Sequence, residues 1–216
     1  MKKLPAFLSV FVALWSLAAA SSAQDAKEGE KKAAMCIGCH GIPGYQASFP
    51  EIHKVPMISG QGAKYITAAL GEYQKGARKH PTMRSIAATL TDKDIADLAA
   101  FYEQQPKNKT AAPKDVPAAP ANVAALLQKA NCESCHGKNF STPVDGLYPK
   151  IAGQHADYLY VALKAYQVTN NPNVGRSNAI MAGQVKPFTH AQLKAIAAYL
   201  ASLPSELHVE PQSRFR

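Results

Sequence analysis

Cysteine is scarce in this chain of 216 residues: there are four, and all of them fall in two copies of one five-residue pattern. Beyond the N-terminal stretch, no segment is apolar enough to cross a bilayer, which takes about 20 residues. No segment alternates between apolar and polar residues as a half-buried strand does. The lysines form no dense run interleaved with aromatic residues. These absences exclude a membrane-spanning body, a β-rich fold and a nucleic-acid-binding protein.

The repeated pattern is Cys-x-x-Cys-His, which is typical of c-type haem attachment. Two thiols three residues apart reach two vinyl positions on one edge of a porphyrin, and the next imidazole then lies beneath the iron. The sequence therefore predicts two covalent haem c groups, each with a histidine as an iron ligand. The residues concerned are Cys36, Cys39 and His40 in the first copy and Cys132, Cys135 and His136 in the second.

The cysteines have two other interpretations, a structural zinc site and a thiol redox pair. A structural zinc site needs four ligands, and the two cysteine pairs could supply them across a long loop. A thiol redox pair needs one Cys-x-x-Cys beside a strand and helix, and no such strand is evident. Neither alternative explains a histidine directly after both second cysteines, so haem attachment is favoured.

The first 23 residues have the organisation of a secretory signal peptide. A basic start is followed by an apolar stretch from Leu4 to Ala20 and by small residues that permit cleavage after Ala23. The alternative is a membrane anchor that stays in place, but the stretch is short for a span and contains a proline. We expect export to the periplasm, a compartment suited to the thiol chemistry that precedes haem attachment.

Basic side chains outnumber acidic ones by 24 to 15, and the excess is uneven. Residues 24–105 carry ten basic and nine acidic side chains, whereas residues 106–216 carry twelve and six. One interpretation is simply a well-solvated surface. The more specific hypothesis is that the second half docks redox partners that have an acidic face, because an uneven charge distribution steers the diffusional encounter of two proteins.

The two halves of the chain repeat each other. Gly60-Gln61 and Gly153-Gln154 are 93 residues apart, and a block that begins at Leu90 recurs 98 residues later. Prolines, alanines and lysines between the halves indicate an extended linker. The predicted organisation is a signal peptide over 1–23, a first domain over 24–105, a linker over 106–120, a second domain over 121–208 and a tail over 209–216.

Each half predicts the same three helices: one before the haem motif, one with apolar residues at helical spacing, and a last one capped by threonine. Their apolar faces are expected against the haem, which replaces core that so few residues cannot supply. The predicted fold class is all-α, with two tandem domains, each wrapped round one covalent haem. The expected ranges are 26–35, 63–73 and the segment after Thr91, then 122–131, 155–167 and the segment after Thr189.

Two methionines occupy matched positions in the halves. Met83 and Met181 each precede the capping threonine by eight residues, in loops before the last helix. Met57 competes, but its repeat partner is Lys150. Core packing is the usual role of methionine, yet the matched positions favour Met83 and Met181 as sixth iron ligands, because His/Met ligation occurs in c-type haems. The bis-His alternatives have no matched positions and are expected at the surface: His53, His80, His155, His190 and His208.

Arginines and tyrosines also occupy matched positions, and each pair has two alternative roles. Arg78 and Arg176 fall in the loops before the methionines, and a guanidinium fits a haem propionate as a fork. The alternative is an exposed arginine. Tyr65 and Tyr158 could donate to a propionate or fill the core, and the core is favoured.

On these residues the chain resembles the dihaem cytochromes c of the cytochrome c4 type, over essentially all of residues 24–205. The resemblance implies two cytochrome c domains related by a pseudo-two-fold, with haem propionates facing each other across the interface. It also implies a periplasmic electron carrier that often delivers electrons to terminal oxidases. The long basic linker and the tail from Leu207 depart from the family pattern.

The predicted function is the transfer of single electrons between respiratory partners, with no enzymatic activity of its own. Expected partners are an oxidase, a cytochrome bc complex or a dehydrogenase, with peripheral membrane association possible and no nucleic acid. The first alternative is an electron-acceptor subunit of a periplasmic dehydrogenase. The second is a dihaem peroxidase or a gas-binding protein with one open iron, which the short chain and the lack of an acid/base pair disfavour.

Overall fold

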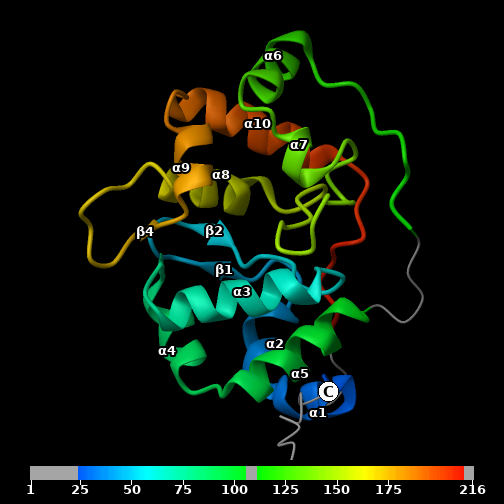
Figure 1. The fold of residues 1–216 in the computed structure, drawn as a ribbon, viewed down its shortest axis with the longest axis vertical. Coiled ribbons are helices and arrows are strands. Elements are labelled where there is room, and N and C mark those ends of the chain that lie inside the picture. Colours follow the sequence, from blue (N-terminus) through cyan, green and yellow to red (C-terminus); the bar gives the residue numbers. More distant parts are fainter. Residues whose placement is uncertain (1–23, 106–110, 212–216) are drawn as a thin grey trace, which may run out of the picture.

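The computed structural model describes residues 24–105 and 111–211, and it forms two helical halves stacked one above the other (Figure 1). The predicted signal peptide lies outside the described residues, as do parts of the predicted linker and tail. Within the described residues, no helix has the length and apolar character that a membrane crossing requires.

The first half contains five helices and three two-residue strands among its described residues. The sequence predicts one helix before the haem motif, but in the structure two helices, separated at Ala33, cover this region and the motif itself. The elements are α1 (Ala26–Lys32), α2 (Ala34–His40), β1 (Gln46–Ala47), β2 (His53–Lys54), α3 (Ala63–Gln74), β3 (Arg78–Lys79), α4 (Pro81–Ala88) and α5 (Asp92–Glu103).

The second half repeats this order with fewer short strands. The predicted helix over 155–167 is shorter in the structure, and the haem motif forms a single helical turn. The elements are α6 (Ala121–Lys129), α7 (Glu133–His136), α8 (Ala156–Ala165), β4 (Gly175–Arg176), α9 (Ala179–Val185) and α10 (His190–Ser202). The short ladders, β1 with β2 and β3 with β4, are the only strands in the described residues and leave the helical class unchanged.

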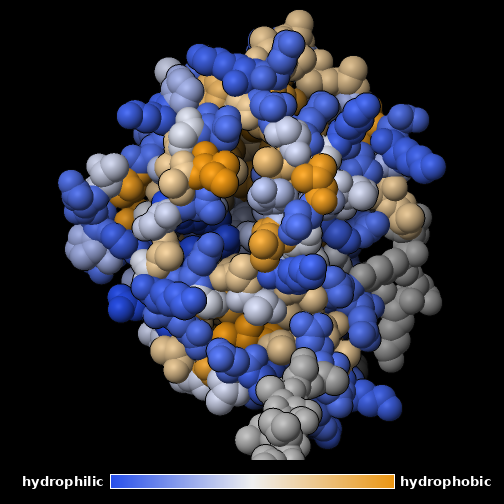
Figure 2. All heavy atoms as spheres, viewed as in Figure 1, coloured by the Kyte–Doolittle hydropathy of each residue, from blue (hydrophilic) through white to orange (hydrophobic). Residues whose placement is uncertain are grey.

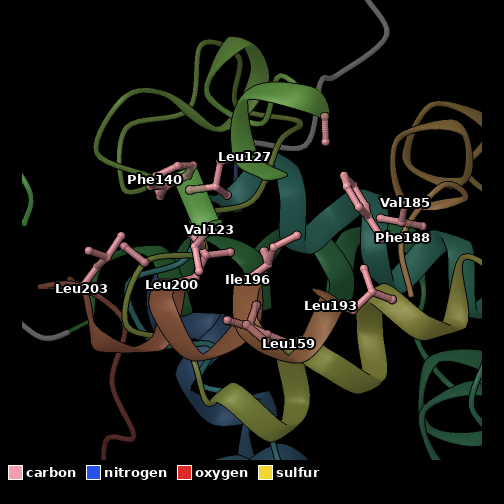
Figure 3. Close-up of a cluster of buried hydrophobic side chains, with 13 residues drawn as sticks. Val123, Leu127, Phe140, Leu159, Val185, Phe188, Leu193, Ile196, Leu200 and Leu203 are labelled. Carbon is pink, nitrogen blue, oxygen red and sulfur yellow. The ribbon is translucent and has the colours of Figure 1, made fainter. Parts of the chain in front are cut away.

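The last helix organises the core of each half. Thr91 and Thr189 are its N-caps, as the sequence predicts, and each forms a complete capping box. In the second half α10 carries Leu193, Ile196 and Leu200, which are at most 4% exposed and pack beside α6 and α8 (Figure 3). In the first half α5 packs against α1 and α3. The helix crossings therefore hold the segment with the haem motif against the rest of each half.

The halves meet along an interface that is nearly symmetric. Strands β3 and β4 pair antiparallel, with Arg78 opposite Arg176. After α10 the chain returns to the first half (Figure 1), where the backbone N–H of His208 donates to the carbonyl of Ser59 at 3.3 Å. Leu207 is buried, so this part of the chain after α10 belongs to the packed structure. The face shown in Figure 2 is mostly hydrophilic with small, separate apolar patches.

Candidate haem-binding sites

The two motif histidines have the same orienting contact. The ring Nδ1 of His40 lies 2.8 Å from the carbonyl oxygen of Pro56, and that of His136 lies 2.9 Å from the carbonyl of Pro149. A carbonyl can only accept, so Nδ1 carries the proton and Nε2 is left with a free lone pair for a metal. Burial lowers the pKa of both histidines, which favours the neutral imidazole.

These carbonyl partners are not predicted by the residue types in the sequence. Pro56 and Pro149 are 93 residues apart, the same spacing as the two Gly-Gln pairs, so the repeat itself was the available signal. A hydrogen bond to a main-chain carbonyl leaves no mark on residue type.

The four cysteines are free thiols in two separate pairs. In the described residues, which include all four, no cluster of three or more His, Cys, Asp or Glu side chains could hold a metal ion, so the zinc alternative is wrong. Burial raises the pKa of Cys36 and raises that of Cys132 to about 11. Burial therefore favours the neutral thiol over the thiolate at these two positions.

The matched methionines lie on short helices, which corrects the prediction that they lie in loops. Met83 is the third residue of α4 and Met181 the third residue of α9. Each helix is capped by a side chain that accepts from the methionine N–H: the ring Nδ1 of His80 at 3.4 Å and Oδ1 of Asn178 at 3.0 Å. Both thioethers are therefore carried by equivalent turns, at half-buried positions.

The matched arginines lie in strands β3 and β4, not in loops. Arg78 is buried, Arg176 is half-buried, and each donates to a tyrosine hydroxyl of its own half at 3.1 Å, Tyr65 and Tyr158 respectively. Each tyrosine hydroxyl thus accepts from the arginine of its half. This contact is neither of the two roles that the sequence suggested, donation to a propionate and core packing. Each guanidinium also lies within 6 Å of a ring centroid in its own half.

The charge around these arginines is not balanced. Arg78 forms an ion pair with Glu72, but among the described residues no carboxylate pairs with Arg176. A guanidinium that is partly withdrawn from water is stabilised by an anionic partner. A carboxylate group such as a haem propionate fits this requirement.

Of the remaining histidines, His53 differs from the prediction. It is 4% exposed, and its Nδ1 lies 2.8 Å from the carbonyl of Glu51. It is therefore a buried structural histidine and not a surface one. The centroid of its ring lies 6.4 Å from that of His80 and 6.2 Å from that of Tyr158 in the second half, so His53 lies at the interface between the halves.

Each half thus contains two thiols next to an oriented imidazole, together with a thioether and a guanidinium at matched positions. A pair of thiols next to an oriented imidazole is the donor set that c-type haem requires, and the residues present fit that group. His40 and His136 would face the iron through Nε2.

Comparison with known proteins agrees with this donor set. The family model described as cytochrome c matches residues 26–105 and 120–204. A cytochrome c4 from Thiocapsa roseopersicina is 30% identical, with 86% of this chain and 96% of the relative covered. A thiosulfate dehydrogenase electron acceptor from Stutzerimonas stutzeri is also 30% identical, covering 81% and 82%.

A solved cytochrome c4 structure from Acidithiobacillus ferrooxidans superimposes with a TM-score of 0.59 at 27% identity. The match covers 79% of this chain and 99% of that one. Two cytochrome c domains with a Cys-x-x-Cys-His motif in each carry two covalent haem c groups. The chain belongs to the cytochrome c family and is a dihaem cytochrome of the cytochrome c4 type.

Proposed function

We propose that the protein is an exported, periplasmic carrier that passes single electrons between respiratory redox proteins, towards a terminal oxidase. In this proposal the signal peptide is removed after Ala23, and the two domains are separated by the linker over 106–120. The protein performs no catalysis of its own. The observation that supports it best is the pair of equivalently oriented histidines, with one methionine at the same position of a short capped helix in each half.

The proposal assigns roles to ten residues. The iron ligands are one histidine and one methionine in each half, so that neither iron has an open position for peroxide or a gas. The thiols attach the haems, and the guanidiniums pair with propionates. The residues are His40, Met83, Cys36, Cys39 and Arg78 in the first half and His136, Met181, Cys132, Cys135 and Arg176 in the second.

When bound, the haems supply reversible one-electron chemistry. The chain's own contribution is to hold the ligands still. The carbonyls of Pro56 and Pro149 fix the rings of the proximal histidines, and the capped helices α4 and α9 fix the thioethers. A coordination sphere that does not rearrange between oxidation states keeps electron transfer fast.

A second candidate is the electron-acceptor subunit of a dehydrogenase, supported by the likeness to a thiosulfate dehydrogenase electron acceptor. A carrier dissociates from its donor after each transfer, whereas a subunit stays bound. Affinity purification of the holoprotein from its native host separates the two. A stoichiometric cofactor-bearing subunit that survives high salt would establish the second candidate, and recovery of the cytochrome alone would favour the carrier.

The ligand assignment is tested by the weak sulfur-to-iron charge-transfer band of the ferric holoprotein, measured per covalent haem. We expect a full band for both haems. Met83→Leu and Met181→Leu should each remove half of it, whereas Met57→Leu, at the competing position, should leave it intact. A band for one haem or none in the wild type would overturn the closed His/Met sites and bring peroxidase or gas-binding chemistry forward.

A further inference from the structure

Each proximal histidine is linked to the opposite half through a single peptide group. The carbonyl of Pro56, which accepts from His40, and the N–H of Met57 belong to the same peptide unit. That N–H donates to Oε1 of Gln154, from the second half, at 3.0 Å. The hydrogen-bond chain therefore runs from the first imidazole, through one peptide, to a side chain of the other domain.

The same arrangement occurs in the other direction. The carbonyl of Pro149 accepts from His136, and the N–H of the same peptide unit, on Lys150, donates to Oε1 of Gln61 at 2.9 Å. Gln61 belongs to the first half. The two chains thus cross the interface in opposite senses.

Both glutamines are held firmly in these positions. Each is 4% exposed. The Nε2 of Gln154 donates to the carbonyl of Met57 at 2.8 Å, and that of Gln61 donates to the carbonyl of Lys150 at 2.9 Å. Each side chain thus makes two bonds to one residue of the opposite half. Because the amides are buried, water does not compete for these bonds.

Hydrogen bonds in a chain polarise one another. An acceptor at the peptide N–H strengthens the peptide carbonyl as an acceptor. A stronger carbonyl draws the Nδ1 proton and makes the imidazole a more basic ligand. A more basic ligand stabilises ferric over ferrous iron and so lowers the reduction potential.

We infer that the two glutamines are positioning residues that act crosswise: Gln154 of the second domain tunes the haem ligated by His40, and Gln61 of the first domain tunes the haem ligated by His136. The inference rests on the proposed role of these histidines as iron ligands. It makes each haem potential depend on the contact with the other domain.

The test replaces each glutamine in the full-length holoprotein by methionine, which has a similar length but cannot form these bonds. Potentials are measured for each haem separately, by redox titration of the paramagnetically shifted haem methyl signals. Gln154→Met should raise the potential of the haem attached at Cys36 and Cys39 and leave the other unchanged. Gln61→Met should do the reverse.

Two other glutamines provide the control, because they bond only within their own half. Nε2 of Gln74 donates to the carbonyls of Ala87 and Leu90, both at 2.9 Å. Gln167 makes the equivalent bonds to Val185 and Phe188. Replacing either by methionine should affect only the haem of its own half.

The crossed pattern is a result that a merely structural role would not produce. Shifts confined to the haem of the mutated half, equal shifts of both haems, or no shift would each overturn the inference. If Gln154→Met fails to fold, Gln154→Asn keeps the amide but is one methylene too short to reach Met57, and should raise the first haem's potential more than the second's. Equal shifts, or a larger change in the second haem, would contradict the inference. No redox partner enters these measurements, so an error in the proposed partners leaves their outcome unaffected.

Discussion

At the scale of single residues, Asp97 shows how the two halves have diverged. Its carboxylate is fully buried and accepts from Lys32 at 2.7 Å, from Lys93 and from the backbone N–H of Asp25. The matching position in the second half is Ala195. The first half therefore depends on a buried charge that the second half does without.

This charge predicts an acid-sensitive first half. Burial raises the pKa of Asp97, but the lysines and the backbone N–H outweigh it and lower the pKa from 3.8 to about 2. A lowered folded-state pKa means that the stabilisation is present above 3.8 and is lost as the pH falls towards 2. In Asp97→Asn, the first half should be less stable at neutral pH and should lose less stability across that window.

The measurement is urea unfolding of the holoprotein at several pH values, with hydrogen exchange to separate the halves. The second half, with alanine at the matching position, serves as the internal control. An unchanged pH slope in the first half of Asp97→Asn would contradict this role.

Residue type alone predicted part of the site. The cysteines and histidines of the haem motif carry a distinctive spacing, so their chemistry could be predicted from the sequence. The carbonyls of Pro56 and Pro149 could not, because any residue offers a carbonyl and only the path of the chain brings it to the imidazole. The burial of His53 was missed for the same reason.

At the scale of elements, the helices were predictable and their ends less so. The capping threonines of α5 and α10 carry strong signals, and both were predicted. The helices that carry Met83 and Met181 were predicted as loops, because glycine, asparagine and proline around them favour turns. In the structure Pro81 and Asn178 begin those helices instead of breaking them.

The crossing of α1 over α5 predicts a sharp effect at one glycine. A Cβ on Gly29 would lie 2.1 Å from the carbonyl oxygen of Asp97 and 2.8 Å from Cβ of Phe101. The backbone of α5 cannot yield without moving the helix, so Gly29→Ala should destabilise the protein by roughly 1–3 kcal/mol. Lys27→Ala, on the exposed side of the same helix, should change stability by less than about 0.5 kcal/mol.

Denaturant midpoints and slopes of the three proteins provide the measurement. Equal stability of Gly29→Ala and Lys27→Ala would show that the helices separate without cost.

The capping boxes give a matched pair of predictions. Thr91→Ala removes a side chain that accepts from the N–H of Asp94, and Thr189→Ala removes one that accepts from the N–H of Gln192. Each should cost about 1 kcal/mol. Hydrogen exchange should report the loss in α5 for the first variant and in α10 for the second, and exchange that rises in the opposite half would argue against independent caps.

At the scale of the whole molecule, the uneven charge predicts which half meets an acidic partner. Lys186 and Lys194 are exposed on the more basic second half. Reversing both to glutamate should slow electron transfer to an acidic acceptor roughly tenfold at low ionic strength. The difference should shrink at high salt, because screening removes long-range steering.

Stopped-flow oxidation at several salt concentrations measures this effect. Lys27 and Lys75, exposed on the first half, provide the matched control when reversed together. A salt dependence that stays the same in the Lys186/Lys194 variant, or changes as much in the control, would place the docking surface elsewhere.

The division into two halves was predictable from the repeat, but their interface was not. The backbone pairing of Arg78 with Arg176 joins residues about 90 to 100 positions apart, and so do the hydrogen bonds that the two glutamines form across the interface. Local patterns contain no information on such contacts, and only the matched positions of these residues hinted at a common role. The return of the chain to Ser59 after α10 had no counterpart in the repeat and carried no signal.

The self-complementary form of this interface also bears on ancestry. Gln154 bonds to Met57 and Gln61 bonds to Lys150, which are matched positions in the repeat. Arg78 lies opposite its own counterpart, Arg176, in the short ladder. This is the contact pattern of a two-fold homodimer. A single-domain ancestor with one such glutamine and one such arginine would already possess both sides of the contact. Fusion would then have supplied no new surface. It would have raised the effective concentration of one half for the other, leaving each copy free to acquire its own charge and its own potential.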